Sequence, residues 1–234
     1  MSDPDDAPRG YASPPCLAHE QDPGFFDPLA TDSRQARDVA RWRRAERERL
    51  LARRRALSAA QRARIARAAS EHLSRLLSDR FGTLKGRAIA AYWPIKGELD
   101  LRASMARWHE AGAFVALPVV ERKAAPLAFR RWTPATRMVR GVWNIPSPPP
   151  DAAPLVPEIA LAPLVGWALD ADGAAWRLGY GGGYLDRTLA ALAPRPFAIG
   201  VGLAAARLST ILAQPHDVPL DAIVTEEGIA GEGP

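Results

Sequence analysis

The spacing of hydrophobic and polar positions divides this chain into an irregular start, a helical stretch and a region of alternating strands and helices. Residues 1–36 combine repeated Pro and Asp with few hydrophobic side chains, and such a segment cannot bury enough apolar surface to fold. We therefore expect a disordered leader there. From Arg37 to Phe81 the chain is rich in Arg, Ala, Glu and Leu and has neither Gly nor Pro, which favours helices. Ser58 and Gln61 have the spacing of a capping box, so this stretch should form one helix ending near Leu57 and a second beginning after Ser58.

Beyond Gly82, short apolar runs alternate with stretches of helical character. The expected strands are 88–93, 114–119, 127–132, 159–165, 197–201 and 222–225. Helices are expected over 101–111, with Asp100 as a candidate N-cap, and from about Tyr184 onward, and a proline-rich connection covers 146–157. Strands that alternate with helices predict an α/β fold with a mainly parallel or mixed sheet flanked by helices. We expect a single domain over residues 37–230, a Rossmann-like three-layer arrangement with an N-terminal arginine-rich helical segment.

Composition is compatible with such a domain and excludes several classes of protein. With 234 residues and 47% hydrophobic content, the chain is long enough to build a core. No apolar run approaches the length of a membrane span, and the N-terminus has acids where a signal peptide needs a basic region, so a cytoplasmic location is expected. The only cysteine, Cys16, excludes an intramolecular disulfide. The net charge of +5 suits nucleic acid and anionic small substrates equally, and therefore does not decide between them.

The segment from Arg177 to Arg187 reads Arg-Leu-Gly-Tyr-Gly-Gly-Gly-Tyr-Leu-Asp-Arg, and it has the composition of a phosphate-binding loop. Glycines let backbone N–H groups converge on phosphate oxygens, and an adjacent carboxylate such as Asp186 can hold Mg²⁺. A dinucleotide fingerprint would need a third glycine where Tyr184 stands, and a Walker A loop would end in Gly-Lys-Ser or Gly-Lys-Thr. The alternative is a turn that only connects two elements, which the flanking charges make less attractive.

This loop resembles the nucleotide loop of the 5-formyltetrahydrofolate cyclo-ligase family, whose pattern is Arg-Leu-Gly-x-Gly-x-Gly-Tyr-Tyr-Asp-Arg. Leu185 stands where that pattern has its second Tyr. Three more segments, residues 92–100, 143–148 and 216–226, are similar to family blocks in the same order, so the resemblance runs from about Arg41 to Glu227.

The resemblance implies an ATP site and a metal site. The ATP contacts it implies are Arg43, Arg47, Arg177, Leu178, Gly179, Tyr180, Gly181, Gly182, Gly183 and Tyr184. The three arginines of that set would also act in catalysis by neutralising the transferred phosphoryl group, and Asp186 and Asp221 would hold Mg²⁺. Three simpler interpretations stay open: arginines on a solvated helix, Asp221 as a turn residue after Pro219, and Tyr184 packing at a helix start.

The resemblance assigns the folate substrate to Trp93, Glu98, Trp143 and Tyr180. One carboxylate can accept two hydrogen bonds from the amide-like edge of a pterin, and an aromatic side chain can cover its ring. From the residues alone, Glu98 is equally well a loop carboxylate without a ligand, Trp93 a core residue at a strand end, and Trp143 a packed loop anchor.

The activity implied is the ATP-dependent closure of 5-formyltetrahydrofolate to 5,10-methenyltetrahydrofolate, with release of ADP and phosphate through an imidate phosphate. We expect a monomer or weak dimer with 5-formyltetrahydrofolate and MgATP as partners and with no membrane or nucleic acid. Two alternatives remain, another small-molecule phosphotransferase on the same fold and an arginine-rich RNA-binding protein, although Trp42 is the only aromatic among the arginines from Arg34 to Arg80 before Phe81. The hairpin before Arg177 is longer than usual for the family, which leaves substrate preference open.

Overall fold

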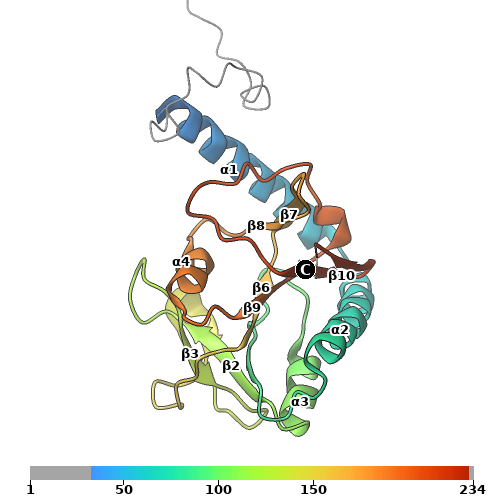
Figure 1. Ribbon diagram of the computed structural model, residues 1–234, viewed down its shortest axis with the longest axis vertical. Coiled ribbons are helices and arrows are strands. Elements are labelled where there is room, and N and C mark those ends of the chain that lie inside the picture. The colour runs from blue at the N-terminus through green and yellow to red at the C-terminus, as the bar shows by residue number, and fades with distance from the viewer. Residues whose placement is uncertain (1–32, 232–234) are drawn as a thin grey trace, which may run out of the picture. The chain divides into compact units, whose positions relative to one another are not determined.

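A computed structural model describes residues 33–231 (Figure 1). The chain divides into two compact units, Met1–Arg44 and Ala45–Pro234, and the sheet belongs to the second unit. Most of the predicted leader lies outside the described residues. Helix α1, however, spans Ser33–Ala56, so the predicted leader's last residues, from Ser33, are helical.

The break between the two N-terminal helices lies where the capping box predicted it. Helix α2 spans Ala59–Phe81, and Ser58 precedes it with extended backbone at φ −66° and ψ 161°. The Ser58 hydroxyl accepts a hydrogen bond from the Gln61 amide at 3.2 Å, and the Gln61 side chain accepts one from the Ser58 amide at 2.8 Å. Both boundary groups are therefore satisfied locally, and the prediction is confirmed.

The central sheet has seven strands in the order β11-β10-β9-β6-β1-β2-β3. Parallel pairing joins five of them: β1 (Ala88–Ala90), β2 (Phe114–Val119), β6 (Ile159–Pro163), β9 (Phe197–Val201) and β10 (Ala222–Thr225). The edge strands β3 (Ala128–Arg131) and β11 (Gly228–Ala230) pair antiparallel to their neighbours. The expected mixed, mainly parallel sheet is confirmed.

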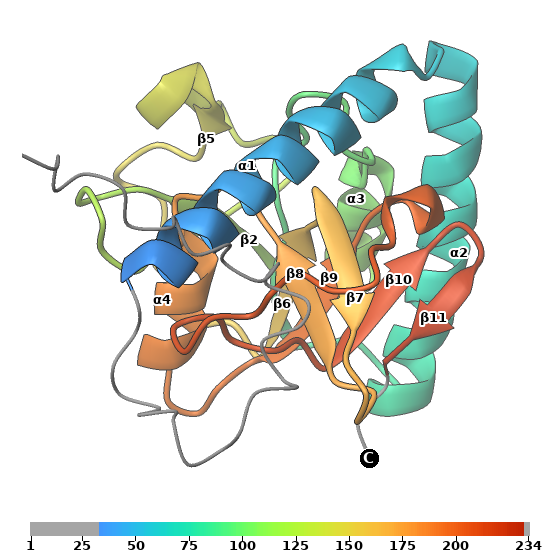
Figure 2. The ribbon, with the colours of Figure 1, turned by 90° about the horizontal axis from the view of Figure 1, so that it is seen from above.

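Alternate residues of the inner strands build two different faces. One face is made of large side chains, such as Ile89, Val115 and Ile159, which pack against α2 and against α3 (Arg102–Glu110). The opposite face is dominated by alanines, which include Ala90, Ala116, Ala160, Ala162 and Ala198. Small side chains let covering elements approach closely, and these elements are helix α4 (Tyr184–Ala191) and the hairpin of β7 (Gly166–Leu169) and β8 (Ala175–Leu178) (Figure 2). The second unit therefore has the predicted three layers.

Some boundaries differ from the sequence prediction. Strand β1 ends at Ala90 instead of continuing to residue 93, and a short ladder of β4 (Val139–Arg140) and β5 (Pro146–Ser147) enters the proline-rich connection. Asp100 is not the N-cap of α3, because the helix begins one residue later and Leu101 has that position. Its carboxylate still accepts the Arg102 amide at 3.0 Å and forms an ion pair with the Arg102 side chain. Asp100 thus accepts a hydrogen bond from the start of the helix, as an N-cap residue would, although it lies one residue before the N-cap.

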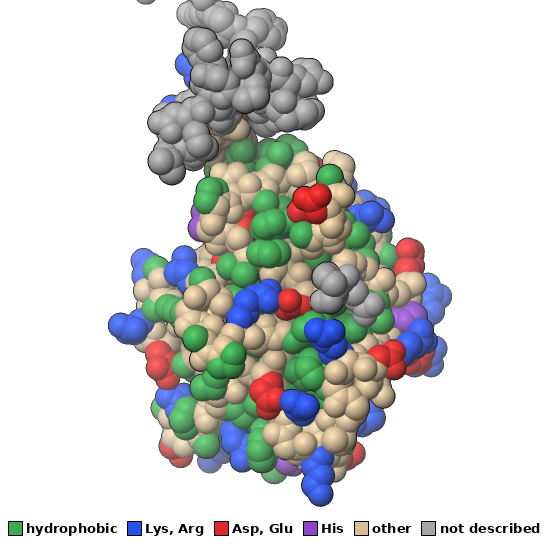
Figure 3. Space-filling model, viewed as in Figure 1, with side chains coloured by type: hydrophobic (Ala, Val, Ile, Leu, Met, Phe, Trp, Pro, Cys, Tyr) green, Lys and Arg blue, Asp and Glu red, His purple; other side chains and the backbone are tan. Residues whose placement is uncertain are grey.

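Within residues 33–231, no helix has the length and apolarity that a membrane crossing requires. On the face seen in Figure 3, Lys and Arg side chains are scattered and interspersed with acidic ones, without a continuous basic strip. That face does not have the distribution of charge that a nucleic-acid groove needs.

Candidate active site

The glycine-rich loop lies between β8 and α4, at the carboxyl end of β6. The Val165 amide, just beyond β6, donates to the Leu178 carbonyl at 3.1 Å, and this bond fixes the place where the loop begins. The segment after β1, residues 93–98, reaches the same edge of the sheet. Ligands of parallel α/β sheets bind at this edge, so the topology brings together the two segments that the sequence assigned to ATP and folate.

The loop backbone relies on glycine at two positions. Gly181 has φ +94° and Gly183 has φ +61°, values in the left-handed region that favours glycine. Gly183 is the N-cap of α4, and no described side chain caps that helix. The amides of its first turn therefore lack side-chain acceptors from the described residues, and the helix dipole favours an anion at this end.

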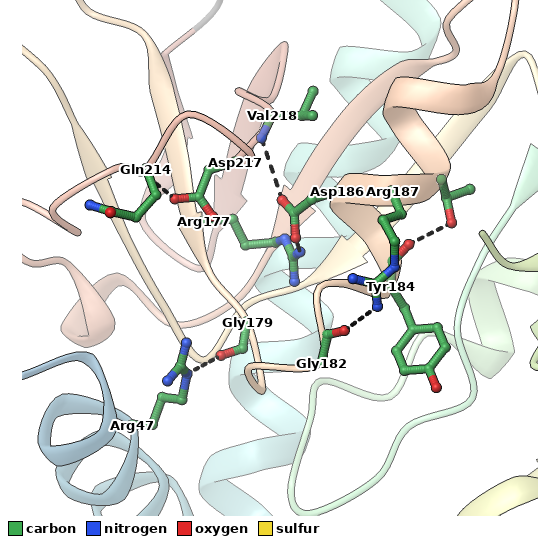
Figure 4. Close-up of polar contacts among 11 residues, drawn as sticks. Arg47, Arg177, Gly179, Gly182, Tyr184, Asp186, Arg187, Gln214, Asp217 and Val218 are labelled. Carbon is green, nitrogen blue, oxygen red and sulfur yellow. Dashed lines mark hydrogen bonds and ion pairs between the residues drawn. The ribbon is translucent and has the colours of Figure 1, made fainter. Parts of the chain in front are cut away.

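Two arginines hold the loop from opposite ends (Figure 4). Arg47 of α1 donates through Nε to the Gly179 carbonyl at 2.6 Å, and Arg187 of α4 donates to the Gly182 carbonyl. Because carbonyl and N–H point in opposite directions across a peptide, the amides that follow these carbonyls point away from the guanidinium groups. The side of the loop backbone that faces away from the two arginines therefore presents backbone amides.

Arg177 and Asp186, the predicted phosphate ligand and the predicted metal ligand, are bound to each other. The Arg177 guanidinium lies 2.9 Å from Oδ2 of Asp186, and both side chains are about one-tenth exposed, at 10% and 11%. The other carboxylate oxygen, Oδ1, has a long contact of 3.5 Å with the Val218 amide (Figure 4). An ionised carboxylate oxygen has spare lone pairs in such a setting, so Asp186 fits a hard cation such as Mg²⁺.

Asp221 has a different set of partners. Its carboxylate accepts two hydrogen bonds from Arg195, at 2.8 and 3.0 Å, and one from the Ala198 amide at 2.6 Å. These contacts place it where β9 and β10 begin, whereas the glycine-rich loop adjoins the strands' carboxyl ends. Within residues 33–231 there is no cluster of three or more His, Cys, Asp or Glu side chains that could hold a metal. The turn interpretation of Asp221 therefore gains support from the geometry.

Glu98 is a second buried carboxylate of the site, 7% exposed. It lies in a tight turn in which Lys96 and Gly97 both have positive φ, +49° and +79°. The Ile95 amide donates to Oε2 at 2.8 Å and the Tyr180 hydroxyl donates to Oε1 at 2.7 Å. Burial raises the pKa of Glu98, and the two hydrogen bonds oppose that rise because they stabilise the ionised form.

Arg54 of α1 completes this cluster, and the sequence analysis did not single it out. Its side chain is 4% exposed and donates to the Lys96 carbonyl at 3.2 Å, to the Leu164 carbonyl at 3.0 Å, and to the Tyr180 hydroxyl. The available signal was its spacing of seven residues from Arg47, which is two helical turns and therefore the same face. That signal was hidden because arginines are dense in this helix.

The predicted aromatic residues lie in two places. Trp93 is partly buried and packs beneath Arg102, whose Cζ is 5.2 Å from the ring centroid. Trp143 is 65% exposed, has φ +56°, and meets Tyr184 edge-on with centroids 5.4 Å apart. The Tyr184 hydroxyl in turn accepts from the Ala124 amide at 3.2 Å. Trp143 is thus not a packed anchor, and it extends over the start of α4.

The predicted basic pair is split between the two units. Arg47 belongs to the second unit and contacts the loop, while Arg43 belongs to the first unit, which ends at Arg44. The role of Arg43 stays a prediction.

Comparison with known proteins decides the family. The 5-formyltetrahydrofolate cyclo-ligase family matches residues 39–226, which include every residue assigned to the site. The chain belongs to this family. Its curated relatives include the 5-formyltetrahydrofolate cyclo-ligases of Mycolicibacterium smegmatis, 34% identical over 150 residues, and of Escherichia coli K12, 30% identical over 143 residues. These matches cover 61% and 58% of this chain and 75% and 76% of the relatives.

Solved structures of similar fold agree with the cyclo-ligase assignment. The 5,10-methenyltetrahydrofolate synthetase of Aquifex aeolicus has a TM-score of 0.65 at 27% identity, over 80% of this chain and 91% of that protein. The synthetase of Mycoplasma pneumoniae has a TM-score of 0.61 at 24% identity, over 79% of this chain and 98% of that protein, and this likeness concerns the fold alone. The resemblance inferred from four sequence blocks is therefore confirmed at the level of family and fold.

Proposed function

We propose that this protein converts 5-formyltetrahydrofolate and ATP into 5,10-methenyltetrahydrofolate, ADP and phosphate. Family membership supports this activity, and one contact carries the argument from geometry. The Tyr180 hydroxyl, in the glycine-rich loop, donates to Glu98 at 2.7 Å, so the segments assigned to the two substrates touch. A reaction between a nucleotide and a folate needs its two sites side by side.

The chemistry requires activation of a poor leaving group. The formyl oxygen attacks the γ-phosphorus, the bond to ADP breaks, and an imidate phosphate forms. Nitrogen 10 of the folate then attacks the activated carbon and loses its proton, and the bond from that carbon to the phosphate oxygen breaks as the ring closes. No protein nucleophile is needed, so the work of the protein is to align the reactants and to stabilise charge on the phosphoryl group.

The residues divide this work according to their positions. Loop amides and the first turn of α4 face the phosphates, and Arg47 and Arg177 supply positive charge beside them. Glu98 receives the polar edge of the pterin, with Trp93, Trp143 and Tyr180 as the aromatic surfaces. Asp186 would hold the Mg²⁺, which neutralises phosphate charge when bound.

Binding of MgATP then replaces an internal ion pair. Arg177 and Asp186 neutralise each other at 2.9 Å. With the nucleotide present, a phosphate can take the place of Asp186 beside Arg177, and a cation can take the place of Arg177 beside Asp186. This exchange keeps both buried charges paired, which matters because an unpaired buried charge is costly.

Absorbance of methenyltetrahydrofolate tests the activity directly. Purified protein should form product only when 5-formyltetrahydrofolate, ATP and Mg²⁺ are all present. Folded protein that releases ADP with another acceptor, but forms no methenyltetrahydrofolate, would instead establish a different phosphotransferase.

Two aspartate variants separate the metal candidates. Asp186→Ala should abolish product formation and raise the Mg²⁺ concentration needed for ATP binding. Asp221→Asn should lower thermal stability, because it weakens bonds to Arg195 and Ala198, while leaving the Mg²⁺ dependence unchanged. A shifted Mg²⁺ dependence in Asp221→Asn would restore Asp221 as a metal ligand.

A further inference from the structure

A directional chain of hydrogen bonds links α1, the glycine-rich loop and the Glu98 turn. Arg54 donates to the Tyr180 oxygen, and the Tyr180 hydroxyl donates to Oε1 of Glu98 at 2.7 Å. A guanidinium group can only donate and an ionised carboxylate can only accept, so the hydroxyl between them has a single orientation. Burial raises the pKa of Tyr180 well above its ordinary value, which keeps the hydroxyl protonated and able to donate.

The three residues of this hydrogen-bond chain are fixed in position to different degrees. Arg54 is 4% exposed and is fixed by the carbonyls of Lys96 and Leu164, independently of Tyr180. Glu98 is 7% exposed and is fixed on its other oxygen by the Ile95 amide. Tyr180 is 36% exposed and belongs to the glycine-rich loop. Among these three hydrogen-bonded residues, Tyr180 is therefore the one whose position depends on the conformation of the glycine-rich loop.

The neighbours of Tyr180 make that dependence strong. Gly179 and Gly181 flank it, and glycine gives a backbone more conformations to lose on ordering than any other residue. A ligand that fixes the loop backbone would remove much of this freedom, and it would hold the Tyr180 hydroxyl on Glu98. A carboxylate with a fixed partner on each oxygen is already oriented for a further ligand, so that ligand loses less entropy on binding.

We propose that Tyr180 couples the two substrate sites, so that MgATP on the glycine-rich loop strengthens folate binding at Glu98, with Arg54 as the positioning residue. The proposal rests on the proposed function, since it needs both substrates. Coupling between sites is reciprocal, so folate must strengthen ATP binding by the same factor. The position of Tyr180 is left open in the cyclo-ligase loop pattern, so the coupling is inferred from this chain's own side chains.

Calorimetric titrations measure this factor. 5-Formyltetrahydrofolate is titrated into the protein alone and into protein saturated with Mg²⁺ and a non-hydrolysable ATP analogue. We expect the folate Kd to fall by at least about fivefold in the presence of the analogue, the lower end of usual coupling factors. The reverse titration, analogue into protein with and without folate, should give the same factor.

Tyr180→Phe is the decisive variant. Phenylalanine retains the ring, including its contact with the Lys96 ammonium 5.3 Å from the ring centroid, and loses only the hydroxyl. The ratio of the folate Kd values without and with the analogue should fall to about one, whatever the affinity of the variant for the analogue alone. Arg54→Lys, which keeps the charge but cannot reach three acceptors, should lower the ratio in the same direction.

Tyr92→Phe is a matched control. It removes the hydroxyl of a nearby tyrosine, which is buried and donates to the Leu99 carbonyl at 3.0 Å and not to Glu98. A general loss of stability would act in both tyrosine variants, whereas loss of coupling should appear only in Tyr180→Phe.

The outcomes distinguish this inference from the function on which it rests. If both ligands bind but their affinities are independent, or if Tyr180→Phe keeps the parental ratio, the coupling is refuted and the cyclo-ligase proposal stands. If well-folded protein binds neither the ATP analogue nor the folate, the proposed function fails and the coupling fails with it.

Discussion

Gly181 provides a test of the loop geometry in which backbone strain and ligand binding can be separated. Its φ of +94° is unfavourable for any residue with a Cβ atom. A side chain in this region costs about 1–2 kcal/mol, and the reduced freedom of the unfolded alanine chain returns about 0.4–1 kcal/mol. Gly181→Ala should therefore lose about 1 kcal/mol of unfolding free energy, or about 2–4 °C in Tm for a chain of this size.

The surroundings of Gly181 add a second effect. A Cβ atom there would lie 3.3 Å from Cζ of Arg47, so the guanidinium must shift by a few tenths of an ångström. Arg47 holds the Gly179 carbonyl at 2.6 Å, and a hydrogen bond from a charged donor contributes about 1.5–3 kcal/mol. If MgATP binds the loop in this conformation, complete loss of the Arg47–Gly179 hydrogen bond would raise the Kd for MgATP about 10- to 100-fold.

Gly173→Ala is the matched control. Gly173, in the turn between β7 and β8, has φ +83°, and a Cβ atom there would meet nothing within 4 Å. Gly173→Ala should show the loss of Tm from backbone strain alone in a circular-dichroism melt, Gly181→Ala should lose at least as much, and only Gly181→Ala should lose MgATP affinity in calorimetry. Equal MgATP affinities in the two variants would refute the link between loop geometry and nucleotide binding.

Three further predictions concern stability and pH. Ser58→Ala removes the cap of α2 and should cost about 1 kcal/mol, seen as a lower Tm with unchanged KM values for both substrates; a normal Tm would show that the capping box is not stabilising. Burial raises the pKa of Glu98 in the folded protein. The stability that this shift contributes is therefore fully present at pH values below the pKa of the same carboxyl in the unfolded chain, and it is lost as the pH rises through the raised pKa of the folded protein. Unfolding free energies of Glu98→Gln should therefore decline less than those of the parent across that window, and parallel pH profiles would contradict the raised pKa. In the parent, the acid limb of kcat/KM for folate should lie above the ordinary range of a glutamate, since only the ionised form accepts two hydrogen bonds.

Local signals in the sequence predicted the helices and most strands well. The capping box at Ser58 located a helix boundary because its two hydrogen bonds involve residues only three apart. Strands β2, β9 and β10 have the predicted bounds, because apolar runs with turn residues at both ends are local patterns. The N-cap of α3 was misplaced by one residue, since Asp100 can accept the Arg102 amide from either position.

The candidate site was predictable only in part. Glycine spacing and the flanking charges identified the loop, and the family pattern identified Glu98, because both are contiguous in sequence. Nothing local indicated that Tyr180 contacts Glu98 across 82 residues or that Arg54 contacts Tyr180 across 126. Asp186 and Asp221 looked equivalent in the sequence, and their partners distinguish them.

The sequence by itself thus determined the family, the α/β class and the segments that carry chemistry, because motif spacing and hydrophobic period are properties of neighbouring residues. The tertiary structure decided which charges are paired, which carboxylates are buried, and which arginine among many reaches the site. Those properties depend on distances between segments far apart in the chain, and on the exclusion of water when the sheet and helices pack. Arg54 illustrates the difference: in sequence it is one arginine in a dense basic helix, and in the fold it is the buried donor to the Tyr180 hydroxyl, between the two segments to which we assign the substrates.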